Sequence, residues 1–130
     1  MNGNKRMTRD ECVEFLGKMG WPDWKSRLAY DACFCCEYCG RDLLATIDDH
    51  RAWEYDHIVP VTSEGSDREE NRAVACKVCN WLKGNRIVPS VDPTKDRNGA
   101  INEIREKIAP LRQRQSDDLA QIRRHFRTES

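Results

Sequence analysis

The sequence has few apolar residues and no long hydrophobic run. Only 38% of its 130 residues are apolar, whereas 34% are charged. No stretch is long and apolar enough for a transmembrane helix, and the start of the chain lacks the apolar run of a secretory signal. We therefore expect a soluble, cytoplasmic protein with no membrane partner. A chain of this length usually forms one domain. Because few apolar residues are available for its core, additional stabilisation by a structural metal is favoured.

The sequence also lacks an excess of charge of either sign. The 22 basic and 22 acidic side chains balance, which argues against a protein that coats nucleic acid non-specifically. The distribution is uneven, because residues 1–65 carry 8 basic and 12 acidic side chains, whereas residues 66–130 carry 14 and 10. The second half could contact phosphates, but charge alone indicates no particular function.

Cysteine, by contrast, is abundant, and four of the seven cysteines form two C-x-x-C pairs. The first pair is Cys36 and Cys39, and the second is Cys76 and Cys79. Two residues between thiols allow a tight turn to point both sulfurs at one ion, and four thiolates complete a tetrahedral Zn²⁺ site. Gly40 suits the first turn because glycine adopts backbone angles that other residues resist. The pattern predicts a closed zinc site whose binding energy stabilises the fold.

Other interpretations of the cysteines are less consistent with the sequence. A disulfide framework is typical of secreted chains, and a redox C-x-x-C is typical of a thioredoxin-like βαβ unit, for which there is no pattern here. Cys33 and Cys36 share the same spacing, but Gly40 and the expected helix end near Cys33 favour the later pair. We expect Cys12, Cys33 and Cys35 to be buried or free thiols.

Hydrophobic periodicity and capping residues predict helices around a small β-structure. Three of the predicted helices cover residues 9–19, 23–32 and 77–86. A fourth begins at a cap formed by Asn98, with Pro110 as a kink or an end, and a last helix is capped by Ser116. Residues 52–61 and 72–75 are rich in strand-forming residues, and the acidic stretch 62–70 is a loop. Residues 41–51 are ambiguous and could contain a short strand and a loop around Asp48 and Asp49.

A second motif lies between the two cysteine pairs. It consists of Asp56-His57-Ile58-Val59-Pro60, then Asn71, then Asn80 directly after the second C-x-x-C. Over residues 36–86 this arrangement resembles the HNH endonuclease motif of the ββα-metal fold. The resemblance implies an α+β protein, in which a ββα-metal core clamped by a Cys₄ zinc site is flanked by N-terminal and C-terminal helices.

The same resemblance implies how the chain is divided. Residues 1–34 would form an N-terminal helical segment, residues 35–90 the nuclease core with its zinc site, and residues 91–130 a C-terminal helical segment. The length of the chain suggests that the three segments form a single compact domain.

By similarity to the family, His57 is the general base that activates water, and Asp56 and Asn80 hold one catalytic divalent cation. Asn71 orients His57 or braces the adjacent loop through hydrogen bonds. Oxygen ligands favour Mg²⁺ or Mn²⁺ at such a site. A neutral imidazole near its ordinary pKa can accept a proton from water at physiological pH. Neighbouring strand residues point to opposite faces, so Asp56 and His57 can flank one phosphate only if the strand ends there, as Pro60 indicates.

Three basic residues are candidates for contact with the substrate. Lys83 lies one helical turn after Asn80, so it could reach the same phosphate or lie on a solvated helix face. Arg72 and Arg86 flank the predicted site and are candidates for contacts with the nucleic-acid backbone.

These inferences together predict a metal-dependent endonuclease that hydrolyses DNA, the choice of DNA resting on the family. One alternative is a zinc-stabilised module that binds nucleic acid without cutting it. Another is a nuclease subunit of a larger defence, phage or mobile-element complex. The C-terminal helices could hold a homodimer or such a complex together.

Overall fold

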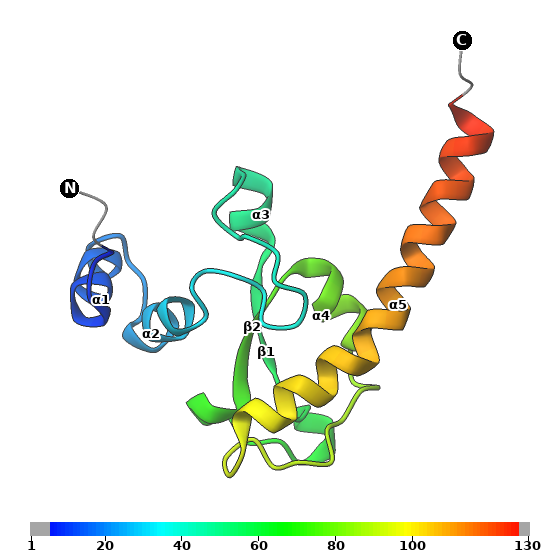
Figure 1. Ribbon diagram of the computed structural model, residues 1–130. Helices are drawn as coiled ribbons and strands as arrows, with labels where there is room; N and C mark the ends of the chain where they lie inside the picture. The colour runs from blue at the N-terminus through cyan, green and yellow to red at the C-terminus, as the bar shows by residue number, and fades with distance from the viewer. Residues whose placement is uncertain (1–5, 128–130) are drawn as a thin grey trace.

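The computed structural model describes residues 6–127, so the outermost residues of the first and third predicted segments lie outside the described part of the chain. It combines helices with a two-stranded antiparallel sheet, which confirms the α+β class. In chain order the elements are α1 (Arg9–Lys18), α2 (Asp23–Asp31), α3 (Ile47–Ala52), β1 (Glu54–His57), β2 (Arg72–Ala75), α4 (Lys77–Lys83) and α5 (Arg97–Phe126), with short 3₁₀ turns at Val61–Ser63 and Glu69–Asn71 (Figure 1). None of the helices within residues 6–127 has the length and apolar character needed to span a bilayer.

Helices α1 and α2 pack against each other on one side of the sheet (Figure 1). The start of α1 is the predicted capping box, in which the backbone N–H of Glu11 donates to Thr8 Oγ1 and the backbone N–H of Thr8 donates to Glu11 Oε1, at 3.2 and 2.7 Å. Gly20 follows with a φ of 94°, so the chain can turn directly after the helix. Helix α2 then contacts β2 and buries Ala29.

The sheet and α4 form the ββα unit that the motif predicts. In the sheet Tyr55 pairs with Val74, Asp56 with Ala73 and His57 with Arg72. Helix α4 contacts both strands. Strand β1 is shorter than the predicted strand region because, after one bond from Ile58 N–H to Asn71, the backbone turns away from β2.

The secondary structure differs from the sequence-based expectation in two places. Residues 47–52, within the stretch that was ambiguous between a short strand and a loop, form helix α3, because Thr46 caps the helix by accepting from the backbone N–H of Asp49 at 3.0 Å. The two predicted C-terminal helices are one continuous helix, α5, and its cap is Asp96 and not Asn98. Pro110 does not end α5 and Ser116 does not cap a new helix. Pro110 lies on the exposed side, so its missing N–H leaves the buried face of α5 intact.

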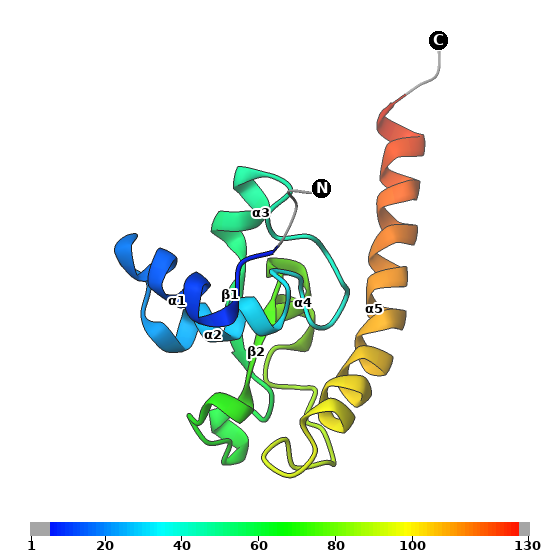
Figure 2. The ribbon, with the colours of Figure 1, turned by 60° about the vertical axis from the view of Figure 1, so that its left-hand side comes forward.

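One hydrophobic cluster draws residues from all three predicted segments, from Ala29 of α2 through the sheet to Ile108 of α5. We therefore propose that the segments fold as one domain. Helix α5 buries Ala100, Ile101, Ile104 and Ile108 and then extends beyond the body of the protein, as Figures 1 and 2 show.

Glu37 ties the first cysteine loop to the sheet and to α5. Its backbone N–H donates to Val74 O and its carboxylate accepts from Val74 N–H, each at 2.8 Å. Arg97 of α5 donates to both carboxylate oxygens of Glu37 at 2.9 Å, and also to Arg72 O at 2.8 Å. Loop, strand and helix are thus held together beside the four cysteines.

Candidate active site and metal centre

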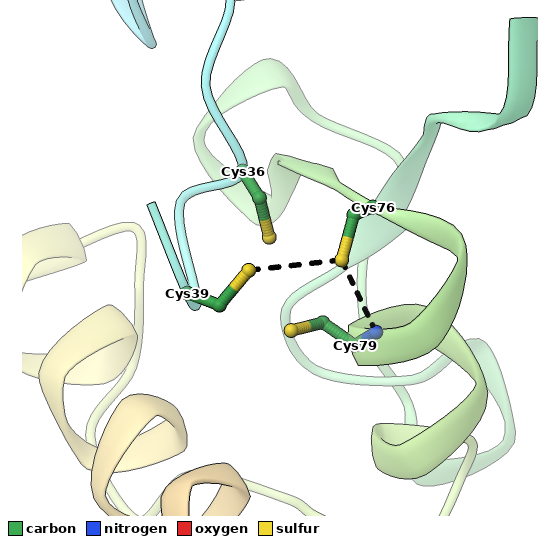
Figure 3. Close-up of side chains that lie close together, drawn as sticks. All are labelled: Cys36, Cys39, Cys76 and Cys79. Carbon is green, nitrogen blue, oxygen red and sulfur yellow. Dashed lines mark hydrogen bonds between the residues drawn. The ribbon is translucent and has the colours of Figure 1, made fainter. Parts of the chain in front are cut away.

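The two C-x-x-C pairs meet in space. Their four sulfur atoms lie within 4.8 Å of one another, the first pair coming from the loop after α2 and the second from the start of α4 (Figure 3). Cys39 Sγ and Cys76 Sγ are 3.7 Å apart. Zn–S bonds of about 2.3 Å in a tetrahedron place sulfurs about 3.8 Å apart, whereas a disulfide would bring them to about 2 Å. The four cysteines could therefore hold one ion such as Zn²⁺.

Local geometry presents these sulfurs to one point. Cys76 is the N-cap of α4, and its sulfur accepts from the backbone N–H of Cys79 at 3.4 Å. In the first pair Gly40 has a φ of 82° and its N–H donates to Cys36 O, which closes the predicted turn. Cys33 lies outside the cluster, so Cys36 and Cys39 form the first pair, as predicted.

Arg112 of α5 contacts the cysteine cluster, and no motif in the sequence indicated it. Its Nε donates to Cys79 Sγ and a terminal nitrogen donates to Cys76 Sγ, each at 3.2 Å. Burial opposes the charge on Arg112, but the bonds to the two sulfurs outweigh this effect and raise its pKa. The guanidinium can offset part of the double negative charge that four thiolates leave around one divalent ion.

A separate pocket of about 230 Å³ lies at the end of β1. It brings together His57, Asp56 and Asn80, the three residues that the motif singles out. Its complete lining is Tyr55, Asp56, His57, Pro60, Val61, Thr62, Asn80, Gly84 and Asn85. Since β1 ends at His57, neighbouring residues with opposite strand orientations can both reach this pocket.

The ring of His57 is held by Asp67, a residue that sequence analysis assigned only to a solvated acidic loop. His57 Nε2 lies 2.9 Å from Asp67 Oδ1, and Arg72 donates to the same oxygen at 2.9 Å. The bonds from His57 and Arg72 lower the pKa of Asp67, which keeps it ionised. An ionised carboxylate only accepts hydrogen bonds, so Nε2 carries the proton and Nδ1 is the basic nitrogen of the neutral ring.

Asp56 is almost fully buried, and its Oδ2 accepts two hydrogen bonds. The donors are the Tyr38 hydroxyl at 2.7 Å and Lys83 Nζ at 3.0 Å. Burial raises the pKa of Asp56, whereas the ammonium of Lys83 and the Tyr38 hydroxyl oppose that shift. Within residues 6–127 no group donates to Oδ1, which leaves this oxygen available at the pocket.

Asn80 lines the same pocket as Asp56, and a hydrogen bond holds its amide group. Its amide nitrogen donates to Glu54 Oε2 at 2.9 Å. The amide oxygen accepts no hydrogen bond from the described residues, so it too is an available oxygen donor. Asp56 and Asn80 thus offer the hard oxygen ligands that Mg²⁺ or Mn²⁺ prefers.

The predicted phosphate contact by Lys83 has to be corrected. The Lys83 side chain is 0% exposed, and its ammonium donates to His57 O at 2.9 Å in addition to its ion pair with Asp56. Lys83 lies on the face of α4 that packs against β1, so its side chain points into the protein. Its function here is to neutralise a buried carboxylate.

The two predicted arginine contacts differ from each other. Arg72 is largely buried, with its guanidinium 4.3 Å from the centre of the Trp24 ring and its charge paired to Asp67. Arg86 is exposed, and among the described residues its guanidinium donates only to Leu82 O, so a contact with phosphate remains a prediction for this residue.

Asn71 is buried and braces the loop that follows His57. Its Oδ1 accepts from Val59 N–H at 2.8 Å, and its Nδ2 donates to Val59 O and Ser66 O at 3.0 and 2.6 Å. Gly65 lies against the same loop, where any Cβ would collide with the carbonyl of Val59. Within residues 6–127 the Asn71 side chain bonds to Val59 and Ser66 and not to the His57 ring, so it braces the loop.

Comparison with known proteins gives one result. Residues 36–86 match the family model described as HNH endonuclease. The matched segment includes both cysteine pairs and every residue of the pocket, and it confirms the resemblance that the motif indicates. No curated protein matches the chain.

The contact between Arg112 and the sulfurs leads to a first prediction. Replacing Arg112 by Ala should weaken zinc retention by about 10- to 100-fold, because an unbalanced thiolate cluster binds the ion less tightly. Zinc release to a chelator of known affinity measures the effect. Arg114→Ala, an exposed neighbour on α5, is the matched control. Equal zinc retention by the two variants would contradict this role.

The burial of Lys83 leads to a second prediction. Lys83→Met should lower the free energy of unfolding by about 3–5 kcal/mol, because the buried carboxylate of Asp56 loses its counter-charge. Lys77→Met, at an exposed position on the same helix, should change it by less than about 0.5 kcal/mol. Urea denaturation without nucleic acid compares them. A Lys83→Met protein as stable as the control would show that this ion pair is dispensable.

Proposed function

Because residues 36–86 match the HNH endonuclease family, we propose that this protein is a metal-dependent endonuclease that hydrolyses phosphodiester bonds of DNA. One observation supports the proposal above all others. His57, Asp56 and Asn80, which are far less informative separately, line the same pocket. A base and two oxygen donors around one cavity are the groups that phosphodiester hydrolysis requires.

In this proposal His57 is the general base. Its Nδ1 takes a proton from the attacking water, and the Asp67 carboxylate holds the ring and stabilises the imidazolium that results. Arg72 in turn holds Asp67, so its effect on the reaction is one of positioning. Asn71 fixes the loop between His57 and Asp67.

Asp56 and Asn80 would hold the catalytic divalent cation, which we propose to be Mg²⁺ or Mn²⁺. When bound, such an ion neutralises charge on the phosphoryl oxygens and assists the departing oxygen. Lys83 and Tyr38 fix Asp56, and the ammonium of Lys83 favours the ionised form of this buried carboxyl group. Glu54 accepts a hydrogen bond from the amide nitrogen of Asn80, which leaves the amide oxygen of Asn80 to bind the cation.

The four cysteines would hold a structural Zn²⁺. A site with four protein ligands has no open position for substrate, so this ion would stabilise the fold and take no part in the reaction. A binding module that never cuts is the rival function, but it gives no reason for His57, Asp56 and Asn80 to share a pocket.

The third prediction tests the proposed base. His57→Ala should reduce cleavage of plasmid DNA in Mg²⁺ or Mn²⁺ by about 10²- to 10⁴-fold, because proton removal from water loses its acceptor. Gel electrophoresis of timed samples measures the rate. His125→Ala, exposed near the end of α5, should cleave like the wild type. Equal rates for the wild type and His57→Ala, with zinc content unchanged in both, would refute the nuclease proposal.

A second candidate function is that of a nuclease subunit in an assembly, and the exposed end of α5 favours it. Leu119, Ile122 and Phe126 are 46%, 55% and 83% exposed, and they recur at helical spacing on the part of α5 that extends from the body (Figure 2). Apolar side chains on one face of a projecting helix are typical of a surface that associates with another helix.

The fourth prediction concerns this exposed stripe. The double variant Leu119→Glu, Ile122→Glu should be monomeric by light scattering at concentrations where the wild type self-associates, because two charges cannot be buried at the interface. Its circular dichroism spectrum should match that of the wild type, since both side chains are outside the core. Gln121→Glu, on the opposite side of the helix, is the control. A monomeric wild type would rule out self-association through α5.

A further inference from the structure

A second hollow adjoins the candidate active site. Its volume is about 600 Å³ and it lies between α2 and β1. Its lining is Pro22, Trp24, Lys25, Trp53, Glu54, Tyr55 and His57. Tyr55 and His57 also line the active-site pocket, so these two side chains form the wall between the two cavities. Whatever occupies this hollow therefore lies directly beside the proposed catalytic base.

The walls of the hollow are aromatic and firmly held. Trp24 and Tyr55 meet edge to face, with ring centres 4.8 Å apart and planes at 82°. The guanidinium of Arg72 lies 4.3 Å from the centre of Trp24 and 5.3 Å from that of Tyr55. Arg72 does not line this hollow but a neighbouring pocket that shares Trp24. One face of Trp24 is thus covered by Arg72, and the ring is fixed where it borders the hollow.

A positive charge lies beside these rings. Lys25 Nζ is 4.6 Å from the ring centre of Trp21 and 5.1 Å from that of Trp53. Lys25 has no ion-pair partner among the described residues, so its charge is available to a ligand. Fixed aromatic rings with an unpaired lysine are the combination that binds unstacked bases and their phosphates in single-stranded nucleic acid.

From these contacts we infer that the hollow binds an unpaired nucleobase next to the scissile phosphate, and that the preferred substrate is a single-stranded segment of DNA. This inference rests on the proposed function for the position of the phosphate. A strand whose phosphate reaches His57 has its adjacent nucleoside beside Tyr55 and Trp24. A base within a duplex would first have to leave its stack, which is unfavourable, whereas an unpaired base enters directly.

The first test needs only the wild-type protein. Fluorescein-labelled twelve-nucleotide DNA strands, each with one abasic site at a different position, are titrated without added Mg²⁺ or Mn²⁺, and binding is followed by anisotropy. The inference predicts that one position loses about tenfold in affinity when its base is removed, while the others change little. The same sequence as a duplex should bind more weakly. Equal affinity for every abasic strand and for the intact strand would overturn the inference.

The second test identifies the protein partner of that base. The Trp24→Ala protein should bind the intact strand about tenfold more weakly than the wild type. Removing the base at the position that matters for the wild type should no longer lower its affinity. Trp81→Ala removes a 61% exposed tryptophan of α4 that does not line the hollow, and its affinity should still fall when that base is removed. Trp24→Phe, which keeps an aromatic face, should bind nearly like the wild type. Equal behaviour of the Trp24→Ala and Trp81→Ala proteins would overturn the assignment. If Trp24→Ala does not fold by circular dichroism, the abasic series on the wild type decides.

The two proposals fail in distinguishable ways. A protein with the predicted base dependence that never cleaves DNA would refute the nuclease proposal and leave the base site intact. A protein that cleaves with dependence on His57, but binds abasic and intact strands equally, would refute only the base site.

Discussion

The convergence of four cysteines is the constraint on which the rest of the structure depends. The two pairs come from distant parts of the chain, and their meeting fixes the loop after α2 against the start of α4. Because Cys76 caps α4, the same convergence sets where Asn80 and Lys83 lie along that helix. Arg112 contacts two of the sulfurs from α5, so the long C-terminal helix is attached to the same point. Because the chain has few apolar residues for its core, an ion bound by the four cysteines would supply folding free energy that hydrophobic burial alone does not.

In the candidate active site, each polar side chain is held by a hydrogen bond or an ion pair from a neighbouring residue. Asp67 holds His57, Tyr38 and Lys83 hold Asp56, and Glu54 holds Asn80. In each case one polar atom of the side chain makes a hydrogen bond, and another has no partner among residues 6–127. Such an arrangement reduces the reorganisation needed when a charged substrate arrives, which is how preorganised sites lower a reaction barrier.

Where sequence reasoning succeeded, the signal was local. The capping box of α1, the second strand and the paired cysteines each depend on residues a few positions apart, and the structure has them as predicted. The errors came where packing decides between local alternatives. Pro110 indicates a kink or an end, but α5 continues because the proline faces solvent while Ile104 and Ile108 are buried. Lys83 was a candidate for phosphate contact, and only its burial against Asp56 shows otherwise.

The sequence by itself indicated the four cysteines that converge, the motif residues His57, Asp56, Asn71 and Asn80, and the α+β class, because fixed spacing and residue chemistry carry that information. Only the tertiary structure decided which partners hold those residues and which basic side chains reach solvent. Asp67, Tyr38, Glu54 and Arg112 have no distinctive spacing relative to the groups that they contact. Their positions follow from how loops and helices pack, and a hydrogen bond or an ion pair forms only when that packing brings donor and acceptor within about 3 Å.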